Sequence, residues 1–190
     1  MVLPEARELH LKGAYVLTPR RYGDDRGFFA ETWNRRALAE VGIDVDFVQD
    51  NHSLSRQKGT VRGLHYQVPP HGQAKLIRCG RGRLIDVVVD IRKGSPTFGQ
   101  HDAVELSAEN GVQVFIPEGF AHGFVTREDD TEICYKCSGY YAPGADRSVR
   151  FDDPALGIDW PITRADAVLS DKDADALPLA EHTLFTWDAT

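Results

Sequence analysis

Short segments rich in valine, isoleucine, phenylalanine and tyrosine recur along the chain, and Gly, Pro, Asp and Asn separate them. Many short strands at such spacing are typical of an antiparallel sandwich or barrel, so the fold class predicted is all-β. The strands expected from this pattern cover residues 14–18, 28–32, 61–67, 74–79, 83–90, 101–106, 111–116, 123–126 and 132–141.

The segment LIDVVVD, within residues 83–90, is β-branched and mostly apolar. This composition predicts a strand that is buried on both faces and lies in the middle of a sheet. Two stretches read as short helices: residues 34–41, with Asn34 as the N-cap, and a turn at 170–175 that follows Ser170. Neither indicates a βαβ repeat, so these helices are expected at the periphery of the sheets.

The length and composition bound the possible organisation. With 190 residues, of which 42% are hydrophobic and 27% charged, we expect one domain, with a core at about 14–160 and a C-terminal segment, 161–190, packed on it. A net charge of -7 argues against nucleic acid or an anionic membrane surface as a partner. No run approaches the roughly 20 apolar residues of a membrane-spanning helix.

The three cysteines, Cys79, Cys134 and Cys137, are odd in number, and no charged and apolar leader opens the chain. Both observations favour the reducing cytoplasm over secretion. Cys134 and Cys137 form a C-x-x-C pair, but residues three apart in a strand point to opposite faces. We therefore expect neither a disulfide nor metal chelation by this pair.

The segment GVQVFIPEGFAH, residues 111–122, places a strand, a Pro-Glu-Gly turn and then His122 at the start of the next strand. It resembles the second motif of the cupin jelly rolls. In metal-binding cupins this histidine joins an earlier His-x-His and a glutamate. Here His65 is followed by Tyr66 and Gln67 in RGLHYQ, so the sequence predicts no metal and no cofactor. A metal-dependent cupin oxygenase stays a distant alternative.

Nine segments in order resemble the dTDP-4-dehydrorhamnose 3,5-epimerase family: VQDNHS, RGLHYQ, QAKLIR, DVVVDIRKGSPTFG, VELSAEN, IPEGFAHGF, YYAP, FDDPALGIDWP and LSDKD. They run from about Gly23 to Asp173. The resemblance implies a cupin-type jelly roll, an isomerase that inverts the carbons beside the ketone of a dTDP-4-keto-6-deoxyhexose, and a homodimer.

Inversion beside a ketone needs proton-transfer groups on both sides of the sugar and stabilisation of the enolate. The resemblance implies that His65 is the base, because imidazole has a pKa of about 6.5, and that Asp173 orients it, with Asp171 as a competitor. It implies that Lys75 faces the C4 oxygen. Tyr135 would return a proton from the opposite face, which a phenol does more readily if neighbouring charge lowers its pKa of about 10.

Further residues are expected to bind the substrate. The candidates for the diphosphate are the cations Arg26, Arg62 and Lys172. The resemblance implies nucleotide contacts by Gln49, Asn51, Phe28 and Glu31, which in this family can cross a dimer interface, and sugar contacts by His122 and Asp146. Asp146 stands where the family often has a glutamate, and His122 is alternatively a structural histidine.

The resemblance leaves the stereochemical outcome open. A monoepimerase acting at C3 or C5 alone would use the same base and acid, so the sequence does not separate it from a 3,5-epimerase. A non-catalytic sugar-nucleotide-binding cupin is a third possibility. It would be expected to lack some of the proton-transfer residues, and His65, Lys75 and Tyr135 are all present.

Overall fold

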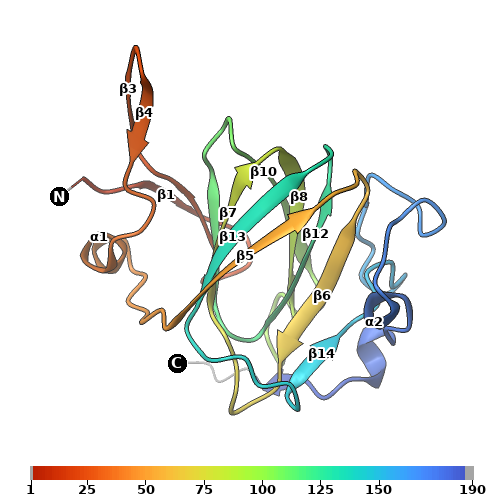
Figure 1. The fold of residues 1–190 in the computed structure, drawn as a ribbon. Coiled ribbons are helices and arrows are strands. Elements are labelled where there is room, and N and C mark those ends of the chain that lie inside the picture. The colour runs from red at the N-terminus through yellow and green to blue at the C-terminus, as the bar shows by residue number, and fades with distance from the viewer. Residues whose placement is uncertain (1, 187–190) are drawn as a thin grey trace.

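Two antiparallel sheets face each other in the computed structural model, which describes residues 2–186 (Figure 1). One sheet has six strands in the order β1-β2-β11-β7-β13-β5 and the other has five in the order β10-β8-β12-β6-β14. The six-stranded sheet consists of β1 (Glu5–Glu8), β2 (Tyr15–Thr18), β11 (Gln113–Ile116), β7 (Lys75–Arg81), β13 (Thr131–Cys137) and β5 (Gln49–Ser55). The five-stranded sheet consists of β10 (His101–Ser107), β8 (Arg83–Asp90), β12 (Phe120–Thr126), β6 (Val61–Gln67) and β14 (Asp146–Ser148). The predicted all-β jelly roll is confirmed.

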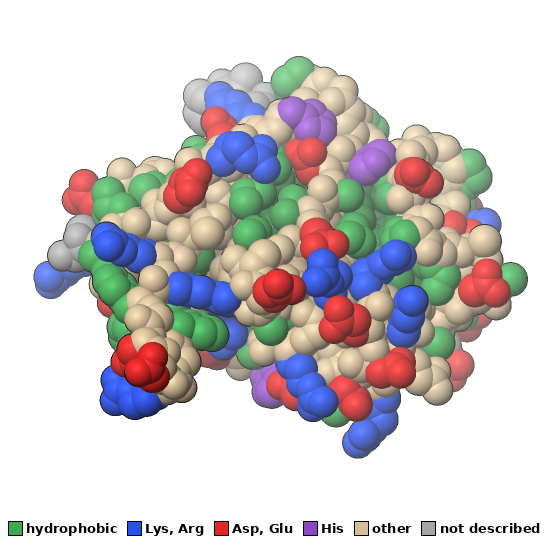
Figure 2. Space-filling view, turned by 90° about the horizontal axis from the view of Figure 1, so that it is seen from above, with side chains coloured by type: hydrophobic (Ala, Val, Ile, Leu, Met, Phe, Trp, Pro, Cys, Tyr) green, Lys and Arg blue, Asp and Glu red, His purple; other side chains and the backbone are tan. Residues whose placement is uncertain are grey.

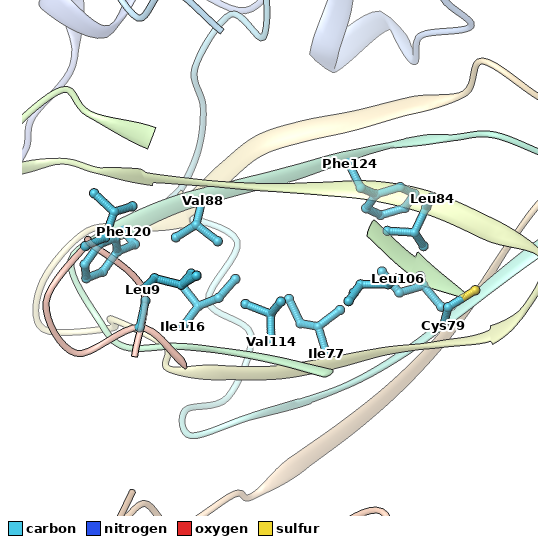
Figure 3. Packing of buried hydrophobic residues seen from close by; sticks show 13 residues of the cluster. Leu9, Ile77, Cys79, Leu84, Val88, Leu106, Val114, Ile116, Phe120 and Phe124 are labelled. Atoms are coloured by element: carbon cyan, nitrogen blue, oxygen red, sulfur yellow. The ribbon is translucent and has the colours of Figure 1, made fainter. Parts of the chain in front are cut away.

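The main hydrophobic cluster lies between the two sheets, as Figure 3 shows. Ile77 and Val114 come from the six-stranded sheet, and Leu84, Val88 and Phe124 from the five-stranded sheet. Leu84 and Val88 lie an even number of residues apart on β8, the spacing expected when both side chains point to the same face of a strand. Burial of this apolar surface between the sheets is the main favourable contribution to folding.

Strand β8 is buried on both faces, as its sequence predicts. Leu84 and Val88 belong to the cluster between the sheets, while Val87 and Val89 belong to a second cluster on the outer face. That outer cluster also contains Leu179, from the C-terminal part of the chain. β8 pairs with β10 on one side and β12 on the other, so it is an interior strand.

The C-terminal segment covers the outer face of the five-stranded sheet; we call residues 160–186 the strap. Val168 bridges to Thr60 beside β6, and Leu177 bridges to Val149. The strap contains α2 (Asp171–Ala174), the 3₁₀ helix η1 (Leu179–Glu181) and β15 (Phe185–Thr186), which pairs with β9 (Arg92–Lys93). The single-domain prediction stays a prediction, and Met1 and residues 187–190 lie outside the described residues.

An N-terminal hairpin projects away from both sheets (Figure 1). It consists of β3 (Arg21–Asp24) and β4 (Gly27–Ala30), and α1 (Arg35–Glu40) follows it. The predicted N-cap of α1 is confirmed, because the Asn34 side chain accepts hydrogen bonds from the backbone N–H groups of Arg36 and Ala37. Two aromatic side chains of the hairpin, Phe28 and Phe29, are 61% and 69% exposed.

The strands that the sequence pattern missed are mostly polar. β5 reads QDNHSLS, and its half-buried positions are Gln49, Asn51 and Ser53, so no apolar alternation marks it. The inward face of β5 borders a polar pocket instead of the core. The expected strand 132–141 was wrong at its end, because β13 stops at Cys137 and Tyr140 and Tyr141 lie in the following loop.

Candidate active site

A pocket of about 390 Å³ opens between the sheets. Strands β5, β7 and β13 of one sheet line one wall, and β6 and β14 of the other sheet line the opposite wall. The inward positions here are polar, although the same strands carry apolar inward residues elsewhere: Lys75 follows the alternation of Ile77, and Tyr135 that of Ile133. The pocket therefore forms where polar residues replace the core pattern.

His65, on β6, lines the pocket and is held by a carboxylate from the strap. Its Nε2 lies 2.6 Å from Oδ1 of Asp173, and the two side chains are 29% and 4% exposed. Burial alone would raise the pKa of Asp173, but the hydrogen bond and charge of His65 lower it overall. Because the carboxylate accepts from Nε2, Nδ1 is the basic ring nitrogen. Asp171, the competing residue, is exposed.

Lys75 lies in the pocket wall on β7, directly opposite Cys137 of β13. Burial lowers the pKa of its ammonium, while Cys137 and the carboxylates of Asp146 and Asp86 act in the opposite direction. Within residues 2–186, no side-chain hydrogen bond or ion pair of Lys75 is formed. The ammonium is thus a desolvated donor with capacity for an oxygen of a bound molecule.

Tyr135 lines the pocket from β13. Burial raises its pKa, Cys137 adds to this, and Arg62 acts in the opposite direction. The condition named in the sequence analysis, a pKa lowered by neighbouring charge, is therefore not met, because desolvation of the phenolate outweighs the effect of the guanidinium. At neutral pH the phenol stays protonated, which suits a group that donates a proton.

His122 lies directly opposite His65 in the register of β12 and β6, yet it does not line the main pocket. It borders a gap of about 10 Å³ that shares Lys75 with the pocket. Its Nε2 lies 2.7 Å from Oδ2 of the fully buried Asp86 on β8. Burial lowers the pKa of His122, against the effect of Asp86, so this imidazole is held neutral.

The two amides expected to contact the nucleotide lie in the pocket and are engaged with the protein. Gln49 accepts a hydrogen bond from the backbone N–H of Tyr141 and donates to Asn51, whose amide donates to the sulfur of Cys137. Each side-chain NH₂ retains one N–H. The network fixes the orientation of both amides at the mouth of the pocket.

Asp146 and Lys172 meet across the mouth of the pocket. The Lys172 Nζ lies 2.5 Å from Oδ2 of Asp146, and the Tyr141 hydroxyl donates to the same oxygen over 3.2 Å. Asp146 belongs to β14 and Lys172 to α2, so this ion pair joins the strap to the sheet. Both residues line the pocket, and their contact with the substrate stays a prediction.

Besides His122, four of the predicted substrate-binding residues lie outside the pocket. Arg62 donates to the Ser55 hydroxyl and to the Leu54 carbonyl. Arg26, Phe28 and Glu31 belong to the projecting hairpin and the residues after it. Arg26 pairs with Asp24 there and its side chain is 89% exposed. Within one copy of the chain, the hairpin does not bring these residues into the pocket.

Sequence reasoning missed several residues of the site. Asp86 is the clearest case: it occupies an inward position between Leu84 and Val88 in LIDVVVD, where a carboxylate interrupts an apolar strand. That interruption was the available signal. Tyr141, Gln67 and Cys137 also line the pocket, but their patterns do not distinguish them from packing or loop residues.

The described residues carry no group of three or more His, Cys, Asp or Glu side chains that could hold a metal ion. The cysteines at 79, 134 and 137 are free. Among helices within residues 2–186, none is long and apolar enough to cross a membrane.

Comparisons with known proteins identify relatives of this chain in sequence and in fold. A family model described as dTDP-4-dehydrorhamnose 3,5-epimerase matches residues 8–181. The protein of that name from Salmonella typhimurium is 51% identical over 172 residues, 90% of this chain and 92% of that protein. The structure of a dTDP-6-deoxy-D-glucose-3,5-epimerase from Legionella pneumophila, in complex with dTDP-4-keto-L-rhamnose, matches with a TM-score of 0.93 at 43% identity, covering 98% of this chain and 100% of that chain.

A 3′-monoepimerase from Streptomyces bikiniensis, solved in complex with dTDP-quinovose, also matches. Its TM-score is 0.84 at 39% identity, and the match covers 90% of this chain and 86% of that chain. The fold is therefore shared by enzymes that differ in the number of carbons they invert. The match over residues 8–181 and the identity over nine-tenths of the chain establish that the chain belongs to the dTDP-4-dehydrorhamnose 3,5-epimerase family.

Proposed function

We propose that this protein is a dTDP-4-dehydrorhamnose 3,5-epimerase that converts dTDP-4-dehydro-6-deoxy-D-glucose to dTDP-4-dehydro-L-rhamnose. The proposal rests on family membership and on one geometric observation. His65 and Tyr135 come from opposite sheets and face the same pocket. A base on one side of the sugar ring and an acid on the other are what inversion of a carbon requires.

The first step is removal of a proton beside the C4 ketone by His65. Its Nδ1 accepts the proton, and the Asp173 carboxylate, 2.6 Å from Nε2, stabilises the imidazolium. The C–H bond breaks, its electron pair forms the C–C double bond of the enolate, and negative charge develops on the C4 oxygen. Lys75, half-buried in the pocket wall and without a protein hydrogen-bond partner among residues 2–186, supplies positive charge to that oxygen.

The second step is delivery of a proton to the opposite face by Tyr135. Because burial raises the pKa of this phenol, it is protonated when the enolate forms. The carbon takes the phenolic proton, the ketone re-forms, and the configuration is inverted. The same sequence at the other carbon beside the ketone would complete the 3,5-epimerisation, and solvent would restore the protonation of His65 and Tyr135.

The test is proton NMR of dTDP-4-keto-6-deoxy-D-glucose incubated with the protein in deuterated water, with a coupled reductase to trap the product. We expect exchange of deuterium at both C3 and C5 and a trapped product with the L configuration. The His65→Asn variant, whose amide cannot act as a base, serves as the control for enzyme-independent exchange. Absence of exchange with the unsubstituted protein would contradict the proposal.

A monoepimerase is the second candidate, favoured by the structural match to the 3′-monoepimerase. The base, the acid and the lysine would have the same roles, and only the pose of the sugar would differ. Exchange confined to one carbon in the NMR experiment would select this reading.

We also infer that the protein is a homodimer in which the hairpin reaches the partner's pocket. The hairpin projects from the barrel and exposes Phe28 and Phe29, and aromatic residues are enriched at protein interfaces. Arg26, Phe28 and Glu31 would then contact the nucleotide of the neighbouring copy. Two-fold dimers are the commonest oligomers.

Light scattering after size-exclusion chromatography tests the dimer, and mixing of variants tests the crossing. A Phe28→Ala/Arg26→Ala chain mixed and refolded with a His65→Asn chain should regain part of the activity, because one site in each mixed dimer is intact. A monomeric protein, or mixtures as inactive as each variant alone, would contradict it.

The expected partners and location follow from the sequence and stay predictions. On the face shown in Figure 2, Lys and Arg side chains are interspersed with Asp and Glu and form no continuous basic surface. This distribution is consistent with a small-molecule substrate in a local pocket. The three free cysteines are consistent with the cytoplasm.

A further inference from the structure

The carboxylate of Asp173 has two oxygens, and each has a different partner. Oδ1 lies 2.6 Å from Nε2 of His65, and Oδ2 accepts a hydrogen bond from the Ser170 hydroxyl over 2.9 Å. The Ser170 hydroxyl oxygen also accepts from the Asp173 backbone N–H over 3.2 Å. The Ser170 hydroxyl is therefore hydrogen-bonded to both the backbone N–H and the carboxylate of Asp173.

The strap fixes both residues relative to β6. Upstream, the Val61 N–H donates to the Val168 carbonyl and the Val168 N–H to the Gly59 carbonyl, so the strap runs beside the start of the strand that carries His65. Downstream, Arg164 donates to the Ala174 carbonyl over 2.5 Å and to Asp152 over 3.0 Å. These hydrogen bonds fix the backbone at both ends of α2. The Asp173 side chain could still rotate, and the hydrogen bond from the Ser170 hydroxyl restricts that rotation.

We propose that Ser170 is a positioning residue for proton transfer, whose hydroxyl holds one oxygen of Asp173 so that the other stays directed at His65. This inference rests on the proposed function for its kinetic consequence, but not for its structural one. Ser170 is not among the residues that line the pocket, so it acts through Asp173 and not on the substrate.

The chain offers a matched control on the same strap. The Thr163 hydroxyl donates to the carboxylate of Asp166 over 2.6 Å, with the same three-residue spacing as Ser170 and Asp173. Thr163 and Asp166 do not line the pocket. Loss of the hydroxyl in Thr163→Ala removes the same kind of hydrogen bond without touching the His65–Asp173 pair.

The experiment compares Ser170→Ala, Ser170→Thr and Thr163→Ala in the full chain. We expect Ser170→Ala to lower kcat for deuterium exchange about tenfold with KM unchanged, since a hydrogen bond to a charged group is lost and water replaces it only in part. Ser170→Thr keeps the hydroxyl and should restore most of kcat. Thr163→Ala should match the unsubstituted protein.

A second readout is independent of activity. Short charge-assisted hydrogen bonds give downfield ring N–H resonances, and the signal of His65, assigned by its absence in His65→Asn, should broaden or move upfield in Ser170→Ala alone. A kcat and a resonance unchanged in Ser170→Ala would overturn the proposal, as would equal losses in Ser170→Ala and Thr163→Ala. If the unsubstituted protein shows no exchange, the proposed function fails, while the resonance still decides the role of Ser170.

Discussion

Two histidine–aspartate pairs lie next to each other in this protein. They differ in burial and in the segment that supplies the carboxylate. His65 and His122 are directly opposite in neighbouring strands, and each is within 2.7 Å of a carboxylate oxygen. The partner of His65 comes from the strap, whereas that of His122 comes from the adjacent strand β8. The His65 side chain is 29% exposed and faces the pocket, whereas the side chain of Asp86, the partner of His122, is fully buried.

The difference shows that environment, and not residue type, separates a reactive pair from a supporting one. An imidazole that takes up a proton needs access to the substrate and a carboxylate that stabilises the resulting charge. His65 meets both conditions. His122 is desolvated, its pKa is lowered by burial, and Oδ1 of Asp86 has no hydrogen-bond partner among the described residues. We interpret the pair of His122 and Asp86 as a buried polar pair that supports the structure next to Lys75.

The largest expected effect is on the exposed pair. His65→Asn should lower the rate of deuterium exchange at the sugar about a thousandfold, because the asparagine amide has no basic nitrogen that can accept the proton. The midpoint of thermal unfolding should stay close to that of the unsubstituted protein. Deuterium exchange at more than about a tenth of the original rate would show that His65 is not the base.

The buried pair should respond through stability instead. His122→Ala leaves the Asp86 carboxylate buried without its partner, so we expect the free energy of unfolding to fall by about 3 kcal/mol. Urea denaturation of His122→Ala and His65→Ala measures the contrast. Equal losses in the two variants would show that the pairs are not distinguished by burial.

The decrease of folding stability at acid pH tests the role of Asp173, the carboxylate of the His65 pair. The folded state lowers the pKa of Asp173, so its contribution to stability is present above the ordinary pKa of about 4 and is lost as the pH falls through the lower folded value. Asp173→Asn should therefore lose less stability than the unsubstituted protein as the pH falls below about 4. Parallel profiles would contradict this assignment.

The smallest expected effect is at alkaline pH and concerns Lys75, which lines the pocket with His65 and the small gap with His122. Burial lowers its pKa, so kcat should decline with rising pH before the ordinary lysine value of about 10.4 is reached. Lys75→Arg, whose guanidinium stays charged, should abolish this limb even if the plateau is lower. An identical limb in the variant would assign it to another group.

Much of the fold was predictable because its strands follow a period of two. β6 and β8 have the predicted bounds, and the burial of β8 on both faces followed from its β-branched composition. β5 was not predictable, since Gln49 and Asn51 face a polar pocket and no apolar pattern marks the strand. A strand that borders a polar pocket lacks the signal that pattern reading depends on.

The sequence by itself determined the family, the all-β class, and the candidates His65, Lys75 and Tyr135. The candidates followed from the resemblance of nine ordered segments to the family, and the all-β class from short strands of period two that local sequence sets. The resemblance implied Asp173 as the partner of His65 and left Asp171 as a competitor; the tertiary structure decided between them and paired His122 with Asp86. Asp173, and not Asp171, meets His65 because the strap runs beside β6, and Asp86 meets His122 because β8 and β12 pair in one register. Contacts between segments distant in sequence depend on how the whole chain buries its apolar surface, and no local pattern encodes them.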